Sequence, residues 1–409
     1  MIIALIVSLF LVVKIKVKQI DGLFVGNENG YALLRDDENN IHQIENLQAN
    51  PLDRISVDIW TLQVGPISYE WVHSTIIKKA GEYGTFIQQM SLEEKLGQMM
   101  IIRTPDNTKQ DLGFEPGGYL LFGNDVANKS EQEIKDMISE LQGLSFGALI
   151  LVDEEGGNVS RISKALHEKP YPSVQHLYQT GGWEAIQSNL MEKSQLLKSL
   201  GIHGNLNPVV DVCQNPEAFI YSRTLGLDAV ETAKYAATAV EIQSEFGLIS
   251  CLKHFPGYGD NLDTHTGISL DQRSLKEYQK RDFLPFVSGI EEGVEMIMVA
   301  HMIMEDVDAE KPASLSSSVH QLLREDLSFD GLVITDDLTM NAIDEYSSNP
   351  LADAVLAGND VLITTDPNVS IQPLVEAVQS GTVSLNQIDQ SLIRIFEIKK
   401  RTGILEKNQ

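Results

Sequence analysis

Cysteine and positive charge are both scarce in this sequence. Only two of its 409 residues are cysteines, Cys213 and Cys251. Two cysteines cannot build a disulfide framework, and both lie in apolar runs where a buried, unreactive thiol is expected. The 31 lysines and arginines are outnumbered by 58 aspartates and glutamates, giving a formal net charge of −27. This charge repels polyanions, so we expect neither nucleic acid nor an anionic membrane surface as a partner.

Motifs that indicate a metal or nucleotide site are missing as well. Neither CxxC nor HExxH occurs, and no GxGxxG follows an early strand. These spacings hold zinc or a dinucleotide in the proteins that carry them. We therefore expect no metal and no organic cofactor.

The only long apolar run is at the N-terminus. Residues 1–13 are too few for a transmembrane helix, which needs roughly 20, but they match the apolar region of a signal peptide. The run lacks a basic start and a cleavage site of small residues, and Lys14, Lys16 and Lys18 follow it instead. An export or anchoring segment at 1–14 and a soluble N-terminal strand both remain open. An envelope or secreted location and a cytoplasmic one remain open with them.

Two further regions follow. Short apolar runs separated by "NENG" and "DDENN" predict hairpins, so residues 15–83 are expected to form a small β-rich module with a connecting helix. A packing or spacer role is favoured for it over a binding role. From residue 84 to 409 short apolar runs alternate with stretches of helical period. The eight runs span residues 98–104, 117–123, 146–155, 202–212, 248–255, 295–302, 331–338 and 359–365.

This alternation predicts a parallel sheet covered by helices, and eight units fit a TIM-like (β/α)8 barrel. A doubly wound open sheet is the alternative. A barrel carries its chemistry at the C-terminal ends of its strands. Ionisable side chains do stand at five of the eight ends: Asp153, Glu154 and Glu155; Asp211; Lys253 and His254; His301; Asp336 and Asp337.

Several blocks resemble the catalytic barrel of glycoside hydrolase family 3, in order from about residue 86 to 405. They include "VDEEGGNVSRI", "LKHFPGYGDNLDTHTG" and "ITDDLTM". The Asp-x-His pair in the second block is similar to that of the NagZ-type β-N-acetylglucosaminidases. The resemblance implies a retaining exo-enzyme that releases terminal N-acetylglucosamine from peptidoglycan or muropeptide fragments. It implies no stable protein partner.

The resemblance also assigns the catalytic roles. Asp336 would be the nucleophile that forms a covalent glycosyl-enzyme intermediate. His265 would be the acid/base, since an imidazole can donate and then accept a proton near neutral pH. Asp263 would fix its tautomer and stabilise its cationic form. The residues expected to bind the sugar are Asp153, Arg161, Arg223, Lys253 and His254. Asp211 and His301 are expected to be structural, and Asp337 a helix cap.

The sequence departs from the family at three positions. Glu154 and Asn158 replace the usual Gln and Arg, and Tyr258 replaces a second His. Tyr258 in particular leaves the specificity open. The alternatives are a β-glucosidase or glycoside phosphorylase of the same family, or a cell-wall-binding barrel without turnover.

Overall fold

The computed structural model describes residues 13–28, 31–37, 40–45, 49, 53–64, 67–78, 83–105, 112–259, 269–340, 343 and 345–405. The chain divides into two compact units, residues 1–90 with 384–393, and residues 91–383 with 394–409. Almost all of the predicted export or anchoring segment, residues 1–14, lies outside the described residues. No helix in the described part of the chain is long and apolar enough to cross a membrane.

The first unit contains a five-stranded antiparallel sheet in the order β3-β2-β1-β4-β5, which confirms the predicted β-rich N-terminal segment. Its strands are β1 (Val13–Glu28), β2 (Tyr31–Arg35), β3 (Ile41–Glu45), β4 (Arg54–Val64) and β5 (Ile67–Lys78). A small cluster including Phe24, Leu34, Ile44 and Ile55 forms its core. At the end of β2, Arg35 donates to Asn386, at 2.6 Å, and to buried Asp389. These contacts explain why residues 384–393 group with this sheet.

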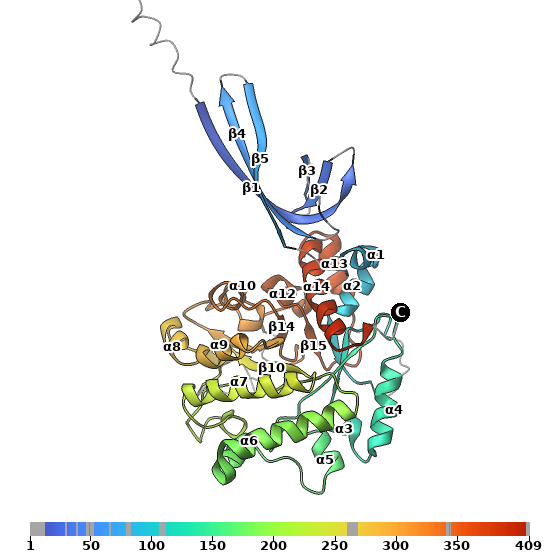
Figure 1. Cartoon of the computed structure of the whole chain (residues 1–409), viewed down its shortest axis with the longest axis vertical. Coiled ribbons are helices and arrows are strands. Elements are labelled where there is room, and N and C mark those ends of the chain that lie inside the picture. The colour runs from blue at the N-terminus through green and yellow to red at the C-terminus, as the bar shows by residue number, and fades with distance from the viewer. Residues whose placement is uncertain are drawn as a thin grey trace, which may run out of the picture. The chain divides into compact units, whose positions relative to one another are not determined.

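The second unit is a barrel of eight strands in the order β14-β12-β10-β9-β8-β7-β6-β15, and all its ladders are parallel (Figure 1). A parallel bridge between Ile334 and Val361 joins the two ends of this order. The strands are β6 (Met100–Arg103), β7 (Gly118–Leu121), β8 (Leu149–Val152), β9 (Gly204–Asn205), β10 (Ile249–Phe255), β12 (Met296–Val299), β14 (Leu332–Thr335) and β15 (Leu362–Thr364). Each lies within one of the eight predicted apolar runs, so the barrel prediction is confirmed and the open sheet is wrong.

Strand β9 is much shorter than the predicted run of residues 202–212. Its regular ladder ends at Asn205, and a single bridge between Val209 and Lys253 continues the pairing further on. Pro208 stands between them and has no N–H to donate, which interrupts the ladder.

Helices cover the outside of the barrel, and α7 packs against α6 and α9 (Figure 1). Their starts follow from local sequence: Ser91, Ser130 and Ser274 each form a capping box with a glutamate three residues later. The described α-helices are α1 (Gly84–Gln89), α2 (Leu92–Gln98), α3 (Gly123–Val126), α4 (Glu131–Leu141), α5 (Ile162–Leu166), α6 (Val174–Ser199), α7 (Ala229–Glu245), α8 (Leu275–Lys280), α9 (Phe283–Glu291), α10 (Ser317–Gln321), α12 (Pro350–Ala357), α13 (Gln372–Gln379) and α14 (Leu385–Arg401). A further two-stranded parallel sheet pairs β11 (Ser269–Asp271) with β13 (Met302–Met304).

Candidate active site

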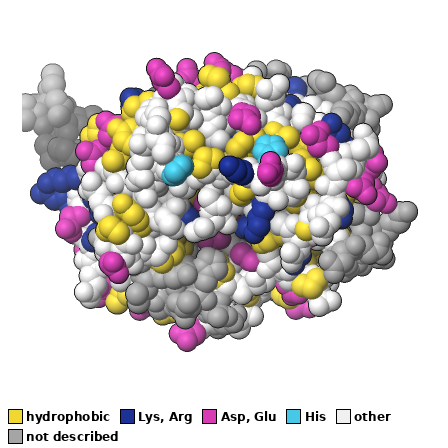
Figure 2. All heavy atoms as spheres, turned by 90° about the horizontal axis from the view of Figure 1, so that it is seen from below, with side chains coloured by type: hydrophobic (Ala, Val, Ile, Leu, Met, Phe, Trp, Pro, Cys, Tyr) yellow, Lys and Arg dark blue, Asp and Glu magenta, His cyan; other side chains and the backbone are white. Residues whose placement is uncertain are grey.

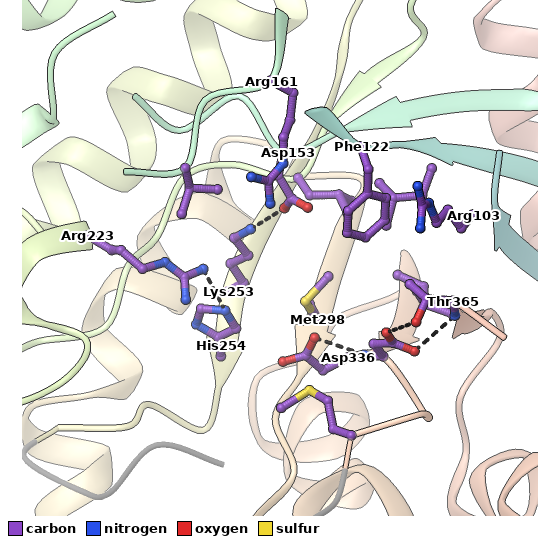
Figure 3. Close-up of a pocket in the computed structure, with 16 residues that line it drawn as sticks. Arg103, Phe122, Asp153, Arg161, Arg223, Lys253, His254, Met298, Asp336 and Thr365 are labelled. Carbon is purple, nitrogen blue, oxygen red and sulfur yellow. Dashed lines mark hydrogen bonds and ion pairs between the residues drawn. The ribbon is translucent and has the colours of Figure 1, made fainter. Parts of the chain in front are cut away.

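A cavity of about 460 Å³ lies at the C-terminal ends of the barrel strands. Figure 3 shows the side chains that line it, drawn from segments far apart in the sequence. Six of the eight predicted site residues are among them: Asp153, Arg161, Arg223, Lys253, His254 and Asp336. The two others, Asp263 and His265, lie outside the described residues. Figure 2 shows basic and histidine side chains near the middle of the face that it presents.

A buried chain of opposite charges forms one wall of the cavity. The Lys253 Nζ lies 2.6 Å from Asp153 Oδ1 and 2.7 Å from Glu155 Oε1. Arg223 donates to both oxygens of the Glu155 carboxylate, from Nη2 to Oε1 at 2.8 Å and from Nε to Oε2 at 3.0 Å. Because each charge has a partner, the wall can stay ionised in spite of its burial.

The pKa directions agree with this pairing. Burial alone would raise the pKa of Glu155, but Lys253 and Arg223 hold that pKa far below its usual value. Burial would likewise lower the pKa of Lys253, and the two carboxylates raise it above the usual value instead. Glu155 was not among the predicted site residues. The sequence signal was present in the "DEEGG" block, where it follows Asp153 by two positions and therefore points to the same side of an extended chain.

His254 is oriented by Asp211, which lies behind it. The Asp211 Oδ2 is 2.8 Å from His254 Nδ1, and Oδ1 accepts the backbone N–H of Tyr258 at 2.8 Å. On the cavity side, Arg223 Nη2 lies 3.3 Å from His254 Nε2. A guanidinium has only donors, so Nε2 accepts and Nδ1 carries the proton that it donates to Asp211.

Tyr258, where the family usually has histidine, is buried and packs on the site from outside. Its ring is tilted against the His254 imidazole at a centroid distance of 5.1 Å and meets Phe219 edge-on at 5.0 Å. The substitution therefore supports the position of His254 and does not place a new group in the cavity lining.

Asp336 follows β14 on the opposite wall. The backbone N–H of Asp337 donates to its Oδ1 at 2.8 Å. Desolvation alone would raise the pKa of Asp336, but the neighbouring His254 and His301 imidazoles, this N–H and the Lys253 ammonium hold the pKa below its usual value. The group is thus an anion at neutral pH, and an anion is the form that a carboxylate nucleophile requires.

The neighbouring Asp337 has a different part in the structure. Its carboxylate accepts from the N–H of Thr339, at 3.1 Å, and from the N–H and hydroxyl of Thr365, at 3.1 and 2.5 Å. It therefore closes the turn after β14 and ties it to the end of β15. His301 in turn contacts the Asp337 carbonyl at 2.9 Å through Nε2 and the Ser314 hydroxyl at 2.7 Å through Nδ1.

The loop after β8 is held by Glu154. Its buried carboxylate accepts the N–H groups of Arg161 and Ile162 at 2.8 and 2.6 Å and the Ser163 hydroxyl at 2.5 Å. This carboxylate caps the first residues of α5 and fixes the position from which Arg161 reaches the cavity. Glu154, which replaces the family glutamine, therefore binds backbone N–H groups of this loop and does not line the cavity.

Arg161 and Arg103 both contact the ring of Phe122. The two guanidinium carbons lie 5.6 and 5.4 Å from the ring centroid. Arg103 and Phe122 were not among the predicted site residues. Arg103 is the last residue of β6 and Phe122 directly follows β7. An ionisable group at a strand end was therefore a usable signal for Arg103, whereas the aromatic Phe122 gave none.

Arg273 lies beyond the cavity lining and joins the two ends of the segment that contains Asp263 and His265. It donates to the Gly257 carbonyl on one side, at 2.8 Å, and to the Asp271 carboxylate on the other, at 2.5 to 3.1 Å. It also forms an ion pair with Asp282 at 2.8 Å. Gly259, at φ +57°, has no room for a side chain, because a Cβ there would lie 2.9 Å from the Arg273 guanidinium.

The arrangement combines an ionised carboxylate with charged donors and acceptors, as recognition of a polyhydroxylated ligand requires. In the described part of the chain no three His, Cys, Asp or Glu side chains are grouped as a metal site would need.

Comparison with known proteins gives a consistent picture. Residues 91–398 match the model of the glycosyl hydrolase family 3 N terminal domain. The chain is 31% identical over 274 residues to a β-hexosaminidase of Methylococcus capsulatus, covering 66% of this chain and 81% of that one. A family 3 β-N-acetylglucosaminidase structure from Paenibacillus sp. FPU-7 matches with a TM-score of 0.70 at 29% identity, over 77% of this chain and 63% of that one. LpqI of Mycobacterium tuberculosis matches with a TM-score of 0.69 at 26% identity, over 76% and 94%.

Proposed function

Because this chain belongs to glycosyl hydrolase family 3 and is a glycosidase of the β-N-acetylglucosaminidase type, we propose that it removes terminal non-reducing N-acetylglucosamine from peptidoglycan or muropeptide fragments. The configuration at the anomeric carbon is retained. No metal or organic cofactor takes part in the proposed reaction.

In the first step the Asp336 carboxylate attacks the anomeric carbon and the bond to the leaving oxygen breaks. His265 gives its proton to that oxygen, so the leaving group departs as a neutral alcohol. The product is a glycosyl ester on Asp336. In the second step His265 takes a proton from water, and the oxygen of that water replaces the ester. Asp263 stabilises the imidazolium that donates in the first step and forms again in the second. The roles of Asp263 and His265 rest on the sequence resemblance.

The remaining charged side chains bind the sugar. Asp153 accepts hydrogen bonds from hydroxyls, and Arg161, Arg223, Lys253 and His254 bind hydroxyls or the N-acetyl carbonyl. Charge-assisted bonds of this kind are about twice as strong as neutral ones. One observation supports the proposal above all others: the ionised Asp336 faces the Asp153–Lys253–Glu155–Arg223 chain across a cavity of about 460 Å³.

The test is steady-state hydrolysis of 4-nitrophenyl N-acetyl-β-glucosaminide by the wild type, Asp336→Ala and His265→Ala. Exposed Asp366→Ala and His176→Ala serve as matched controls. We expect the first change to abolish turnover, the second to reduce it by about 10²-fold or more, and the controls to leave it unchanged. Faster hydrolysis of the corresponding glucoside would identify a β-glucosidase, and a product that becomes sugar 1-phosphate in phosphate buffer would identify a phosphorylase. A wild type inactive on both glycosides would favour a binding protein.

A further inference from the structure

A second cavity of about 510 Å³ adjoins the first and shares Arg103, Phe122 and Arg161 with it. Its remaining walls come from the segments that follow β7 and β8, within residues 123–128 and 160–165. Asp336 does not line it. Figure 3 shows Arg161, Phe122 and Arg103 across the catalytic cavity from Asp336. The second cavity therefore begins on the side of the catalytic cavity that lies across from the proposed nucleophile.

The charge of this cavity is opposite to that of the protein. Its described lining includes the cations Arg103, Arg161 and Lys164 and no acidic side chain, in a chain of net charge −27. Asp125 pairs with Arg103 at 3.0 Å. For Arg161 and Lys164 the described part of the chain supplies no ion-pair partner.

Positive charge and space coincide in this cavity. Guanidinium and ammonium groups bind anionic groups through charge-assisted hydrogen bonds, and a guanidinium can bind a sulfate or phosphate with two donors. Arg161 and Lys164 therefore favour an anionic group in the cavity of about 510 Å³.

The side of the sugar that this group belongs to follows from the position of Asp336. In the proposed reaction Asp336 attacks the anomeric carbon, so that carbon lies beside it, and ring carbons C4 and C5 lie on the other side of the pyranose. Arg103, Phe122 and Arg161 lie across the catalytic cavity from Asp336 (Figure 3). The second cavity therefore adjoins the side of the sugar that carries C6.

We propose that the second cavity binds a negatively charged group attached at C6 of the N-acetylglucosamine that occupies the catalytic cavity. A C6 sulfate ester and a C6 phosphate ester share this chemistry. The inference rests on the proposed function, since it takes its orientation from the anomeric carbon at Asp336.

The first test compares 4-methylumbelliferyl N-acetyl-β-glucosaminide with its 6-sulfate and its 6-phosphate. The wild type is expected to have a higher kcat/KM for at least one anionic substrate, and the two arms separate a sulfate from a phosphate. Lys164→Gln, which alters only the second cavity, is expected to reduce the ratio of anionic to neutral kcat/KM by about three- to tenfold. Lys169→Gln removes the same charge from an exposed position outside both linings and should keep the wild-type ratio.

A wild type that prefers the neutral substrate over both anionic ones would overturn the proposal, and so would an unchanged ratio in Lys164→Gln. A preference for a carboxylate on the leaving group alone would overturn it too. If the wild type hydrolysed none of the substrates, the proposed function would fail first. Calorimetry would then decide the inference by itself: N-acetylglucosamine 6-phosphate binding more tightly than N-acetylglucosamine supports it, and equal affinity overturns it.

Discussion

The ionisation of Asp336 controls the acidic side of the pH profile. Its pKa in the folded protein is below the usual value, so the carboxylate is present above that value and is lost as pH falls through it. We expect the acidic limb of log kcat/KM to lie below about pH 4, the ordinary value for aspartate. The basic limb should come from the His265 and Asp263 pair and disappear in His265→Ala. An acidic limb near pH 6 would contradict the assignment of Asp336.

Glu155 forms ion pairs with Lys253 and Arg223, so its replacement should leave both cations without this partner. Glu155→Gln keeps the shape of the side chain but turns an amide with donors toward Lys253 and Arg223. Removing one partner of a buried ion pair typically costs about 3–5 kcal/mol, so we expect a comparable fall in the free energy of unfolding and a raised KM. Urea denaturation with kinetics checks this, with exposed Glu184→Gln as control. A variant as stable as the wild type would show that the pair does not stabilise the fold.

Single site residues could be predicted from sequence where their position at the C-terminal end of a strand was enough to place them in the site. Asp153, Lys253 and Asp336 stand at strand ends, and a parallel barrel brings all such ends to one rim. Phe122 was not predicted because its part in the site depends on the contact with Arg161 and Arg103, and no local pattern encodes a contact between separate segments. The roles of Asp263 and His265 stay predictions, since both lie outside the described residues.

At the level of elements, Arg273 links the two stems of the segment that contains Asp263 and His265. We expect Arg273→Lys, which cannot bridge Gly257 and Asp271 together, to misplace the acid. Activity on 4-methylumbelliferyl N-acetylglucosaminide should fall by about 10²-fold. Activity on the 2,4-dinitrophenyl glycoside should fall much less, because its leaving group needs little protonation.

Exposed Lys276→Ala is the control for that experiment. An equal loss on both substrates would mean that Arg273 supports the fold in general and does not position the acid. The comparison of leaving groups is what separates the two roles, since a general loss of folded protein lowers both rates alike.

Elements were predicted well where one physical rule decides them. The eight apolar runs became strands because their residues are buried on both faces in a helix-covered parallel sheet. The extent of β9 was wrong because its run of apolar residues continues through Pro208, and the backbone donor that proline lacks does not alter hydrophobicity. The pattern of hydrophobic residues predicts which residues are buried, but it does not show where a backbone N–H is absent.

For the barrel unit as a whole, the buried Lys399 of α14 connects this helix to the segments that lead into the early barrel strands β6 and β8. Lys399 Nζ in α14 donates to Gln98 Oε1 at 2.5 Å and to the Gly147 carbonyl at 2.6 Å. These residues precede β6 and β8. Lys399→Met keeps the volume but leaves buried acceptors unpaired, so we expect it to lower the free energy of unfolding by about 1–3 kcal/mol. Chemical denaturation measures the change, with Lys400→Met, exposed on the same helix, as the comparison. Equal stability of the two variants would contradict the expected role.

The chain of charges from Asp153 through Lys253 and Glu155 to Arg223 has a consequence for how this protein can change. Three separate segments contribute to it: the loop after β8, the segment that ends at Arg223, and strand β10. Each charge has a partner of opposite sign, so replacing one member alone leaves another buried charge unpaired and lowers stability. Laboratory evolution by single steps will therefore leave this wall intact. New sugar preferences should arise first at Phe122, which lines the cavity with an uncharged side chain, so its replacement leaves no buried charge without its ion-pair partner.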